Sequence, residues 1–497
     1  MFHLKLCFGL LLLYTINGSK LQYNDLKDYF KQRRQLIKKT ESDSIGAKLN
    51  LTSEEEIVNN LLMLWKNQAF EEGMRQPEKF LAGRHFFDVK AEIEKTQIFK
   101  FIQKLPKGAS LHSHDTALVC SEYIFENITF RDNLYAKNGS EIALQFSKTP
   151  PDSSWKPISW FRQNDNSFDQ RLKQQITLFR TDPEVFYIQT NIWSVFESLF
   201  TTLTPLLTFE PVFRDYYYQA LKELYEDNIK YLELRGILPT LYDLEGRTYG
   251  YEYLIKIYYE TTQQFIKDYP DFWGVKFIFA PHRVTNNTEI EDHMNFIVAM
   301  NRKYPNFIAG FDLVGQEDTG TPLKSYIPAL LEMKRATNLF FHAGETLWNG
   351  ARIDENLIDA VLLNTSRIGH GYAVLKHPEV MKIVKERGIA LEICPISNQV
   401  LGLVRDLRNH PANYLIAHNY PVVIAPDDPS FWGAKALSYD WYMAFMGMSS
   451  KHSDLRLLKQ LAINSIVYSS MEEDLKNESL KKWTQDWEQF IKNVIFN

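Results

Sequence analysis

The chain has 497 residues, of which 45% are hydrophobic and 14% aromatic, and a formal net charge of −5. This length and composition allow a large buried core and more than one domain. The mild charge without a dense basic stripe argues against a nucleic-acid partner, and no glycine-rich loop ending in Lys-Ser or Lys-Thr offers a phosphate cradle. Only Cys120 and Cys394 follow Cys7, so no disulfide framework is expected.

Residues 1–19 are predicted to form a secretory signal peptide. Lys5 precedes an apolar run at residues 6–13, and the small residues Gly18 and Ser19 follow. This run is too short to span a bilayer and no other segment is apolar enough, so we expect a secreted, extracellular protein without a membrane span. Asn-x-Ser/Thr triplets agree with export as a glycoprotein. They begin at Asn50, Asn127, Asn138, Asn286, Asn364 and Asn477.

Residues 20–100 are predicted to form a helical N-terminal module. Residues 25–38 and 53–70 carry apolar side chains at helical spacing, and Thr52-Ser53-Glu54-Glu55-Glu56 is typical of a helix start. The module is either a passive scaffold or a surface for dimerisation or a receptor, and its sequence favours neither alternative.

Residues 101–497 are predicted to form a (β/α)₈ barrel. Eight short runs rich in Val, Ile, Leu and Phe alternate with helix-like segments, such as residues 251–269, 289–304, 353–363 and 378–387. Strands that alternate with helices in this way are typical of an α/β fold with a closed parallel barrel. The runs span residues 109–114, 229–236, 275–280, 308–315, 339–345, 367–371, 389–395 and 421–426.

A long segment separates the first predicted strand from the second. Residues 187–200 and 212–226 look helical, whereas residues 120–170 are rich in Asn, Ser, Pro and aromatic residues. Long irregular segments inside a compact domain are usually functional or separate insertions. We therefore predict an inserted subdomain at residues 120–170 near the barrel mouth, with a binding role; the alternative is a surface excursion.

Four short motifs fall at the ends of the first, fifth, sixth and eighth predicted strands. A parallel barrel gathers these ends at one mouth, where its enzymes act. Alone, each motif could be a core histidine, a turn or a helix N-cap. Together they provide the imidazole and carboxylate ligands of a catalytic zinc site, with acid–base groups beside it. The motifs are His112-Ser113-His114-Asp115, His342-Ala343-Gly344-Glu345, Gly369-His370-Gly371 and Asp427-Asp428.

These motifs, with Arg367-Ile-Gly-His370-Gly, Cys394-Pro-Ile-Ser-Asn398 and Asp427-Asp428-Pro429, resemble the adenosine deaminase family over nearly the whole mature chain. The signal peptide, the helical module, the insertion and Gly310-Phe-Asp-Leu-Val-Gly315-x-Glu-Asp resemble its secreted branch, the adenosine deaminase-related growth factors. The resemblance implies hydrolysis of adenosine, and of 2′-deoxyadenosine, to inosine or deoxyinosine and ammonia. It also implies growth-factor-like action through removal of extracellular adenosine, homodimerisation through residues 20–100, and a receptor or glycan partner for residues 120–170.

The resemblance further implies a role for each site residue. One Zn²⁺ per subunit, held by His112, His114, His342 and Asp427, would activate a water molecule. His370 would orient this water and take its proton, and Glu345, kept protonated by apolar surroundings, would protonate purine N1. Asp428 would bind a ring nitrogen or the water, and the Gly315 N–H would approach N3. The implied ribose and substrate contacts are Trp193, Glu197, His282 and Asp115.

Three alternatives to these assignments and one departure from the family pattern follow from the sequence. Trp193 and Glu197 share a helix face by their spacing, but ordinary helix packing would give the same pattern. The protein could instead be a receptor- or glycan-binding growth factor that acts independently of catalysis, or an enzyme for another aminopurine or nucleotide. The secreted branch commonly has a disulfide in the insertion, whereas Cys120 has no partner there.

Overall fold

The computed structural model describes residues 25–179, 189–284 and 287–496, so the predicted signal peptide lies outside the described residues. The chain divides into two compact units, residues 1–42 and 43–497. The first contains α1 (Leu26–Glu41), which is N-capped by the Asp25 side chain and has no buried residue. Its last turn carries Lys38 and Lys39, whose charges complement the helix dipole.

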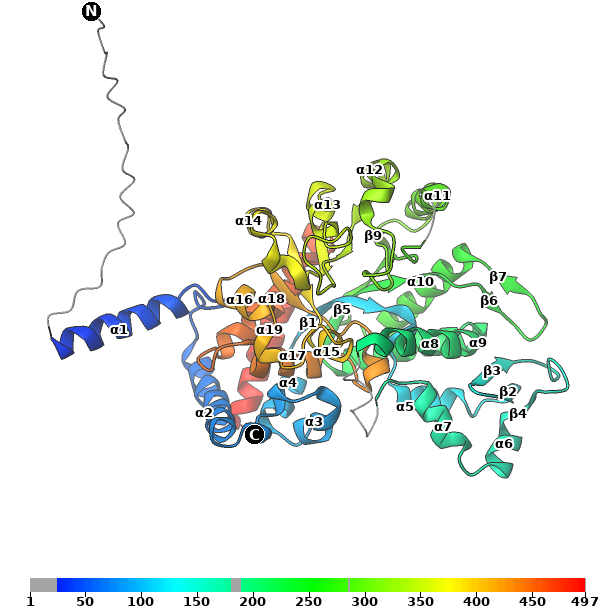
Figure 1. The fold of residues 1–497 in the computed structure, drawn as a ribbon, viewed down its shortest axis with the longest axis horizontal. Helices are drawn as coiled ribbons and strands as arrows, with labels where there is room; N and C mark the ends of the chain where they lie inside the picture. Colours follow the sequence, from blue (N-terminus) through cyan, green and yellow to red (C-terminus); the bar gives the residue numbers. More distant parts are fainter. Residues whose placement is uncertain (1–24, 180–188, 285–286, 497) are drawn as a thin grey trace, which may run out of the picture. The chain divides into compact units, whose positions relative to one another are not determined.

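The second unit is built on the predicted parallel strands (Figure 1). They form two sheets, in the orders β1-β5-β8-β9-β10 and β11-β12-β13-β14. The strands are β1 (Gly108–His114), β5 (Ile229–Gly236), β8 (Gly274–Phe279), β9 (Ile308–Phe311), β10 (Asn338–Leu339), β11 (His342–Ala343), β12 (Arg367–His370), β13 (Ala390–Ile393) and β14 (Val422–Ile424).

Backbone contacts join the two sheets at both edges. The N–H of Phe340 donates to Phe311 and the N–H of Gly369 donates to Phe341, so β10 and β11 are two halves of the predicted fifth strand. At the other edge, a parallel bridge joins Ser113, in β1, to Asp427, just after β14. The eight predicted strands are thus present in the predicted order, and the fold is an α/β barrel.

Helices surround the strands and cover their apolar outer faces (Figure 1). The predicted helical segments are confirmed with small shifts at their ends. The helices that follow strands are α10 (Tyr251–Asp268), α11 (Asn287–Lys303), α12 (Ile327–Ala336), α13 (Asn356–Leu362), α14 (Pro378–Arg387), α15 (Pro395–Val400), α16 (Ala412–Ala417), α17 (Ser438–Met443) and α18 (Leu455–Val467). α8 (Gln189–Leu207) and α9 (Glu210–Glu226) precede β5.

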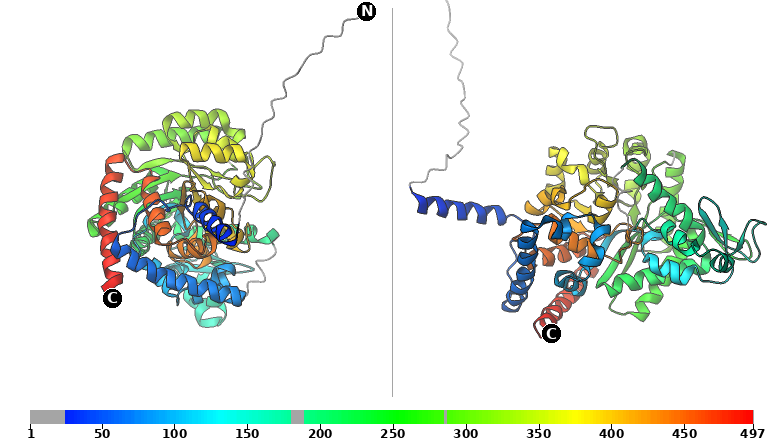
Figure 2. Two further views of the ribbon diagram at one scale, coloured as in Figure 1. Left: turned by 90° about the vertical axis from the view of Figure 1, so that its left-hand side faces the viewer. Right: turned by 60° about the horizontal axis from the view of Figure 1, so that its bottom comes forward.

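The N-terminal helices α2 (Ser53–Arg75), α3 (Phe86–Ile93) and α4 (Gln97–Lys104) belong to the same compact unit as the barrel. The predicted helix start is confirmed, because Thr52 and Glu55 form a reciprocal capping box. α2 lies beside the C-terminal helix α19 (Glu473–Phe496) (Figure 2). The fully buried Lys66 ammonium donates to Ser449 Oγ and to the Ser450 and Ser453 carbonyls, which fixes α2 to the loop before α18.

The segment predicted as an insertion contains a small sheet and short helices. A three-stranded antiparallel sheet, in the order β3-β2-β4, is followed by α6 (Ile158–Asn164) and α7 (Phe168–Gln175). Leu134 and Ala136 of β2 alternate with exposed or half-buried neighbours, as expected for a sheet with one buried face. The strands are β2 (Leu134–Asn138), β3 (Ile142–Phe146) and β4 (Lys156–Pro157). Its binding role stays a prediction. Among the described residues, no helix is both long and apolar enough to cross a membrane.

Candidate active site

A cavity of about 430 Å³ lies at the carboxyl ends of the barrel strands. Of the twelve residues predicted for the site, all except His112 line it, and His112 lies directly behind His114. A larger groove of about 720 Å³ opens near Gly108, at the opposite end of β1, and has no histidine or cysteine in its lining. The first cavity is therefore the candidate active site.

Two imidazoles and one carboxylate meet at the cavity floor. His112 Nε2 lies 3.3 Å from His114 Nε2, and the two nitrogens lie 3.2 and 3.1 Å from Asp427 Oδ1. With His342 they form a group whose four ligand atoms all lie within 4.8 Å of one another. The parallel bridge between Ser113 and Asp427 holds the two ends together. Asp427 itself has a left-handed backbone, with a φ of 60°, which is a strain often found at functional sites.

Buried carboxylates behind the site fix the histidine tautomers. His112 Nδ1 lies 2.7 Å from Glu392 Oε2, and His342 Nδ1 lies 2.7 Å from Asp312 Oδ2. A ring nitrogen paired with a carboxylate carries the proton, so each Nε2 presents a lone pair to the centre. Asp427 Oδ1 is also buried there without a hydrogen-bond donor. Several acceptors converging without a donor fit a divalent cation, and imidazole with carboxylate is a donor set that suits zinc.

Two arginines neutralise these carboxylates. Arg235 donates to Asp312 at 2.8 Å and to Glu392 at 2.7 Å, while Arg367 donates to Glu392 at 2.5 Å and to Glu233 at 2.6 Å. All five side chains are buried inside the barrel. The pKa of Glu392 is lowered below its usual range because these arginines and His112 outweigh the opposing effect of burial.

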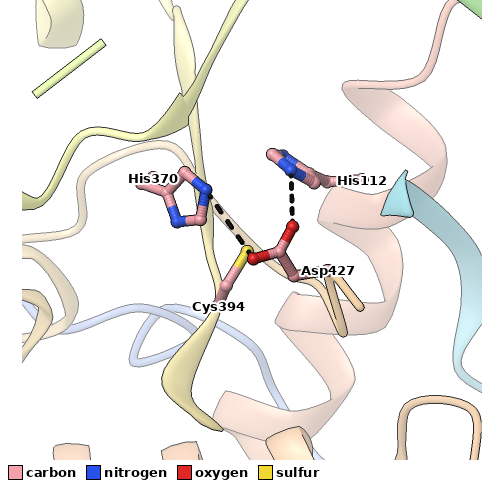
Figure 3. Close-up of side chains that lie close together, drawn as sticks. All are labelled: His112, His370, Cys394 and Asp427. Carbon is pink, nitrogen blue, oxygen red and sulfur yellow. Dashed lines mark ion pairs between the residues drawn. The ribbon is translucent and has the colours of Figure 1, made fainter. Parts of the chain in front are cut away.

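A thiol adjoins the metal ligands. In Figure 3 the Cys394 sulfur lies beside the Asp427 carboxylate, which faces both His112 and His370. The four could form a second ligand group, but burial holds the pKa of the Cys394 thiol well above its usual range, and the thiolate is the form that binds metals. Cys394 is also absent from the cavity lining. The group with His114 and His342 is therefore the better metal site.

Glu345 faces the same centre from the loop after β11. Burial, followed by the negative charges of Asp427 and Glu317, raises the pKa of Glu345 well above its usual range. The predicted protonated carboxyl group therefore fits its surroundings. Glu345 Oε1 lies 3.6 Å from His370 Nε2. Asp428 is buried beside them, and burial together with the Asp427 and Glu345 charges raises its pKa as well.

A chain of hydrogen bonds orients His370. The N–H of Ala412 donates to His410 Nδ1, so His410 Nε2 carries a proton and donates it to Asn398 Oδ1 at 3.0 Å. The Asn398 amide nitrogen then lies 3.2 Å from His370 Nδ1 as its donor. The neutral His370 ring consequently carries its proton on Nε2, the nitrogen that faces Glu345 and Asp427.

The predicted substrate contacts line the wall of the cavity. Trp193 and Glu197 enter from α8, and His282 and Gly315 from the loops after β8 and β9. Gly315 has a φ of +100°, and a Cβ there would lie 3.3 Å from His282 Nδ1, so a side chain would be strained and crowded. Asp115 accepts a hydrogen bond from Tyr258 at 2.8 Å, and burial raises its pKa to about 7.

Sequence reasoning missed the residues that support the site. Glu233 and Arg235 of β5 and Glu392 of β13 are charged residues inside otherwise apolar strands, which is a recognisable signal of a buried ionic network. Phe196 and Phe200 also line the cavity from the helix that carries Trp193. Cys120 is not in a disulfide; its thiol donates to Glu223 at 3.2 Å.

Comparisons with known proteins agree with this geometry. Residues 173–485 match the adenosine deaminase family model, and residues 8–102 match the adenosine/AMP deaminase N-terminal model. The chain is 48% identical to an adenosine deaminase of Phlebotomus duboscqi, over 91% of this chain and 89% of the relative. It is 41% identical to adenosine deaminase 2 of Homo sapiens, over 98% and 97% of the two chains.

Solved structures show the same fold. An Arabidopsis ADAL in complex with GMP superposes with a TM-score of 0.57 at 16% identity, covering 78% of this chain and 98% of the other. An amidohydrolase of Burkhoderia ambifaria with bound Zn has a TM-score of 0.55 at 19% identity, covering 80% and 95%. The predicted family, its growth-factor-related branch and the barrel are confirmed. The chain belongs to the adenosine deaminase family and is a hydrolase that deaminates adenosine.

Proposed function

We propose that the protein is a secreted, zinc-dependent deaminase that removes extracellular adenosine and 2′-deoxyadenosine. The observation that carries the proposal is the convergence of imidazole lone pairs and Asp427 Oδ1 at the floor of the cavity, next to a carboxyl group with a raised pKa. One Zn²⁺ per subunit would be held by His112, His114, His342 and Asp427. When bound, it would make water a stronger nucleophile at neutral pH.

Glu345 would act on the purine ring as a general acid. Its raised pKa favours the protonated form, in which its carboxyl group can donate to N1 while water attacks C6. The Gly315 N–H would hold N3 from the opposite loop. These two contacts would fix the six-membered ring against the cavity floor, with the exocyclic amine as the leaving group.

His370 and Asp428 would control the attacking water. Because Asn398 donates to His370 Nδ1, the neutral ring presents an N–H through Nε2 and would orient the water as a donor. Asp428 Oδ1 is buried without a hydrogen-bond donor and lines the cavity, so it is available to accept a proton or a hydrogen bond. His370 could take the water proton, as the resemblance implies, only after a change of tautomer.

The polar lining of the cavity favours nucleosides over nucleotides, because its described residues offer a phosphate no free cation. Its lining includes the carboxyl groups of Asp115, Glu197 and Asp428, besides those of Glu345 and Asp427. Among the described lining residues Arg235 is the one Arg or Lys, and its guanidinium is already paired with Asp312 and Glu392. A 5′-phosphate would therefore meet carboxyl groups and, within this described lining, no free cation to pair with.

Surface features support export and self-association. The triplet asparagines Asn50, Asn127, Asn138, Asn364 and Asn477 are all exposed, as glycosylation requires; Asn286 lies outside the described residues. On α1, Leu26 is 72% and Leu36 is 56% exposed, and Tyr29, Phe30 and Ile37 are exposed too. Such an apolar helix face fits homodimerisation. If the sedimentation mass is unchanged after removal of residues 20–42, α1 is not the dimer contact.

The decisive experiment measures ammonia release from adenosine, 2′-deoxyadenosine and adenosine monophosphate by the purified protein. Glu345→Gln and a chelated sample are expected to lose turnover, whereas Glu379→Gln, which alters an exposed carboxylate of α14, should keep it. Near-full turnover of Glu345→Gln, or equal rates on the monophosphate, would contradict the proposed site.

A second candidate function concerns the insertion. Phe130 is 56% and Trp160 is 46% exposed, and the Arg162 guanidinium stacks 3.7 Å above the Phe130 ring. Exposed aromatic side chains of this kind suit a receptor or glycan. If Glu345→Gln stimulated cells as well as the active protein, growth-factor action would be independent of catalysis.

A further inference from the structure

Glu317 is a buried acidic residue whose charge helps to raise the pKa of Glu345, but whose hydrogen bonds the proposed chemistry does not use. It follows β9 in the loop that contains Gly315, and the residue is 1% exposed. Three groups from a different part of the chain donate to its carboxylate. The Gly344 N–H and the Asn356 amide donate to Oε1 at 3.1 and 2.7 Å, and the Glu345 N–H donates to Oε2 at 2.6 Å.

The same two loops are joined a second time. Thr346 Oγ1 donates to Asp318 Oδ1 at 2.5 Å, and the Trp348 N–H donates to Thr346 Oγ1 at 3.0 Å. Asn356, at the start of α13, also accepts the Leu323 N–H at 2.8 Å. The loop after β9 and the loop after β11 are therefore fastened along their length, with the Glu317 carboxylate at the buried end.

Both loops need such an anchor because of their backbone. Gly315 and Gly344 have φ values of +100° and +78°, which residues with a side chain rarely adopt. Glycine gives a loop more freedom than any other residue, so contacts with neighbouring groups are needed to hold a glycine-containing loop in one conformation. For the Gly344-Glu345 peptide groups, the Glu317 carboxylate supplies contacts from both of its oxygens.

We propose that Glu317 is a positioning residue that fixes the Glu345 carboxyl group relative to the Gly315 N–H. The inference rests on the proposed function, in which these two groups hold N1 and N3 of one purine ring. A carboxylate suits this task because both oxygens accept. A glutamine would place an amide N–H₂ against a backbone N–H donor, and an aspartate would be one methylene too short.

The test compares Glu317→Gln with the wild type and with Glu379→Gln as the matched exposed control. Displacement of Glu345 should lower kcat for adenosine about 10- to 100-fold, since small misplacements of a catalytic group have effects of this size. The second readout is the inhibition constant of 1-deazaadenosine, in which carbon replaces N1. This analogue has no acceptor for Glu345, so its affinity should stay within about twofold, and bound zinc should remain at the wild-type level.

Two results would overturn the inference. One is a kcat of Glu317→Gln within about twofold of the wild type, because positioning would then be unnecessary. The other is a fall in 1-deazaadenosine affinity, or in bound zinc, by the same factor as the fall in kcat. Glu317 would then support the whole cavity rather than Glu345. If Glu317→Gln does not fold, Glu317→Asp takes its place, with a smaller loss of kcat and the same unchanged analogue affinity expected.

A failure of the proposed function would look different. Substantial turnover by Glu345→Gln would remove the role of Glu345 whatever Glu317 does. An inactive Glu345→Gln together with a fully active Glu317→Gln would refute the positioning role alone.

Discussion

Substitution of Arg235 by methionine should damage both the stability of the barrel and its affinity for zinc. The guanidinium is fully buried and donates to Asp312 at 2.8 Å, to Glu392 at 2.7 Å and to the Leu111 carbonyl at 3.0 Å. Methionine preserves most of the volume and removes every donor. The two carboxylates would then remain buried with fewer partners.

The expected loss follows from this geometry. Removing one partner of a buried ion pair costs about 3–5 kcal/mol. Glu392 would keep Arg367 and His112 as partners, whereas Asp312 would keep no arginine, so most of the loss should arise at Asp312. Because Asp312 orients His342, zinc affinity should also fall about 10- to 100-fold.

The assays are urea unfolding of the metal-free protein and competition for zinc with a chelator of known affinity. The control is Arg247→Met, because the Arg247 side chain is 67% exposed in its pair with Asp243, and exposed pairs contribute at most about 1 kcal/mol. If Arg235→Met unfolded within about 1 kcal/mol of the wild type and bound zinc equally well, the supporting role of the buried network would be wrong.

Three further outcomes are expected. Chelation should abolish deamination and lower the thermal midpoint, and added zinc should restore both, because the converging acceptors bind the ion only in the folded protein; full activity without metal would contradict the site. Trp193→Ala should raise KM for adenosine about tenfold with little change in kcat if the indole stacks on the substrate; an unchanged KM would leave Trp193 as a packing residue. Burial lowers the pKa of His410 to about 3, below its unfolded value near 6.5, so its contribution to stability is present above pH 6.5 and lost as the pH falls. Between pH 7 and 5 the wild type should lose about 2 kcal/mol more than His410→Gln, measured by urea titration, and parallel losses would refute the buried neutral ring.

Local sequence was sufficient where neighbouring residues carry the whole signal. The alternation of His112 and His114 places both imidazoles on one face of β1, whatever the rest of the chain does. The apolar runs and the helical segments between them predicted the strands and helices of the barrel in the correct order along the chain. The fifth strand, predicted as continuous, consists of two short pieces, and residues 340–341 carry its backbone hydrogen bonds across the break.

The tertiary structure decided which distant residues support the ligands. Glu392 lies 280 positions after the histidine it orients, and Arg235 reaches across the barrel to both Glu392 and Asp312. Such pairings depend on the register between strands, and a shift of one residue would turn these side chains to the opposite face. Short-range patterns contain no information about register between distant strands. The sequence by itself therefore determined the chemistry at the strand ends, and only the closed barrel determined the ionic network beneath it and the Glu317 contacts that hold Glu345 in place.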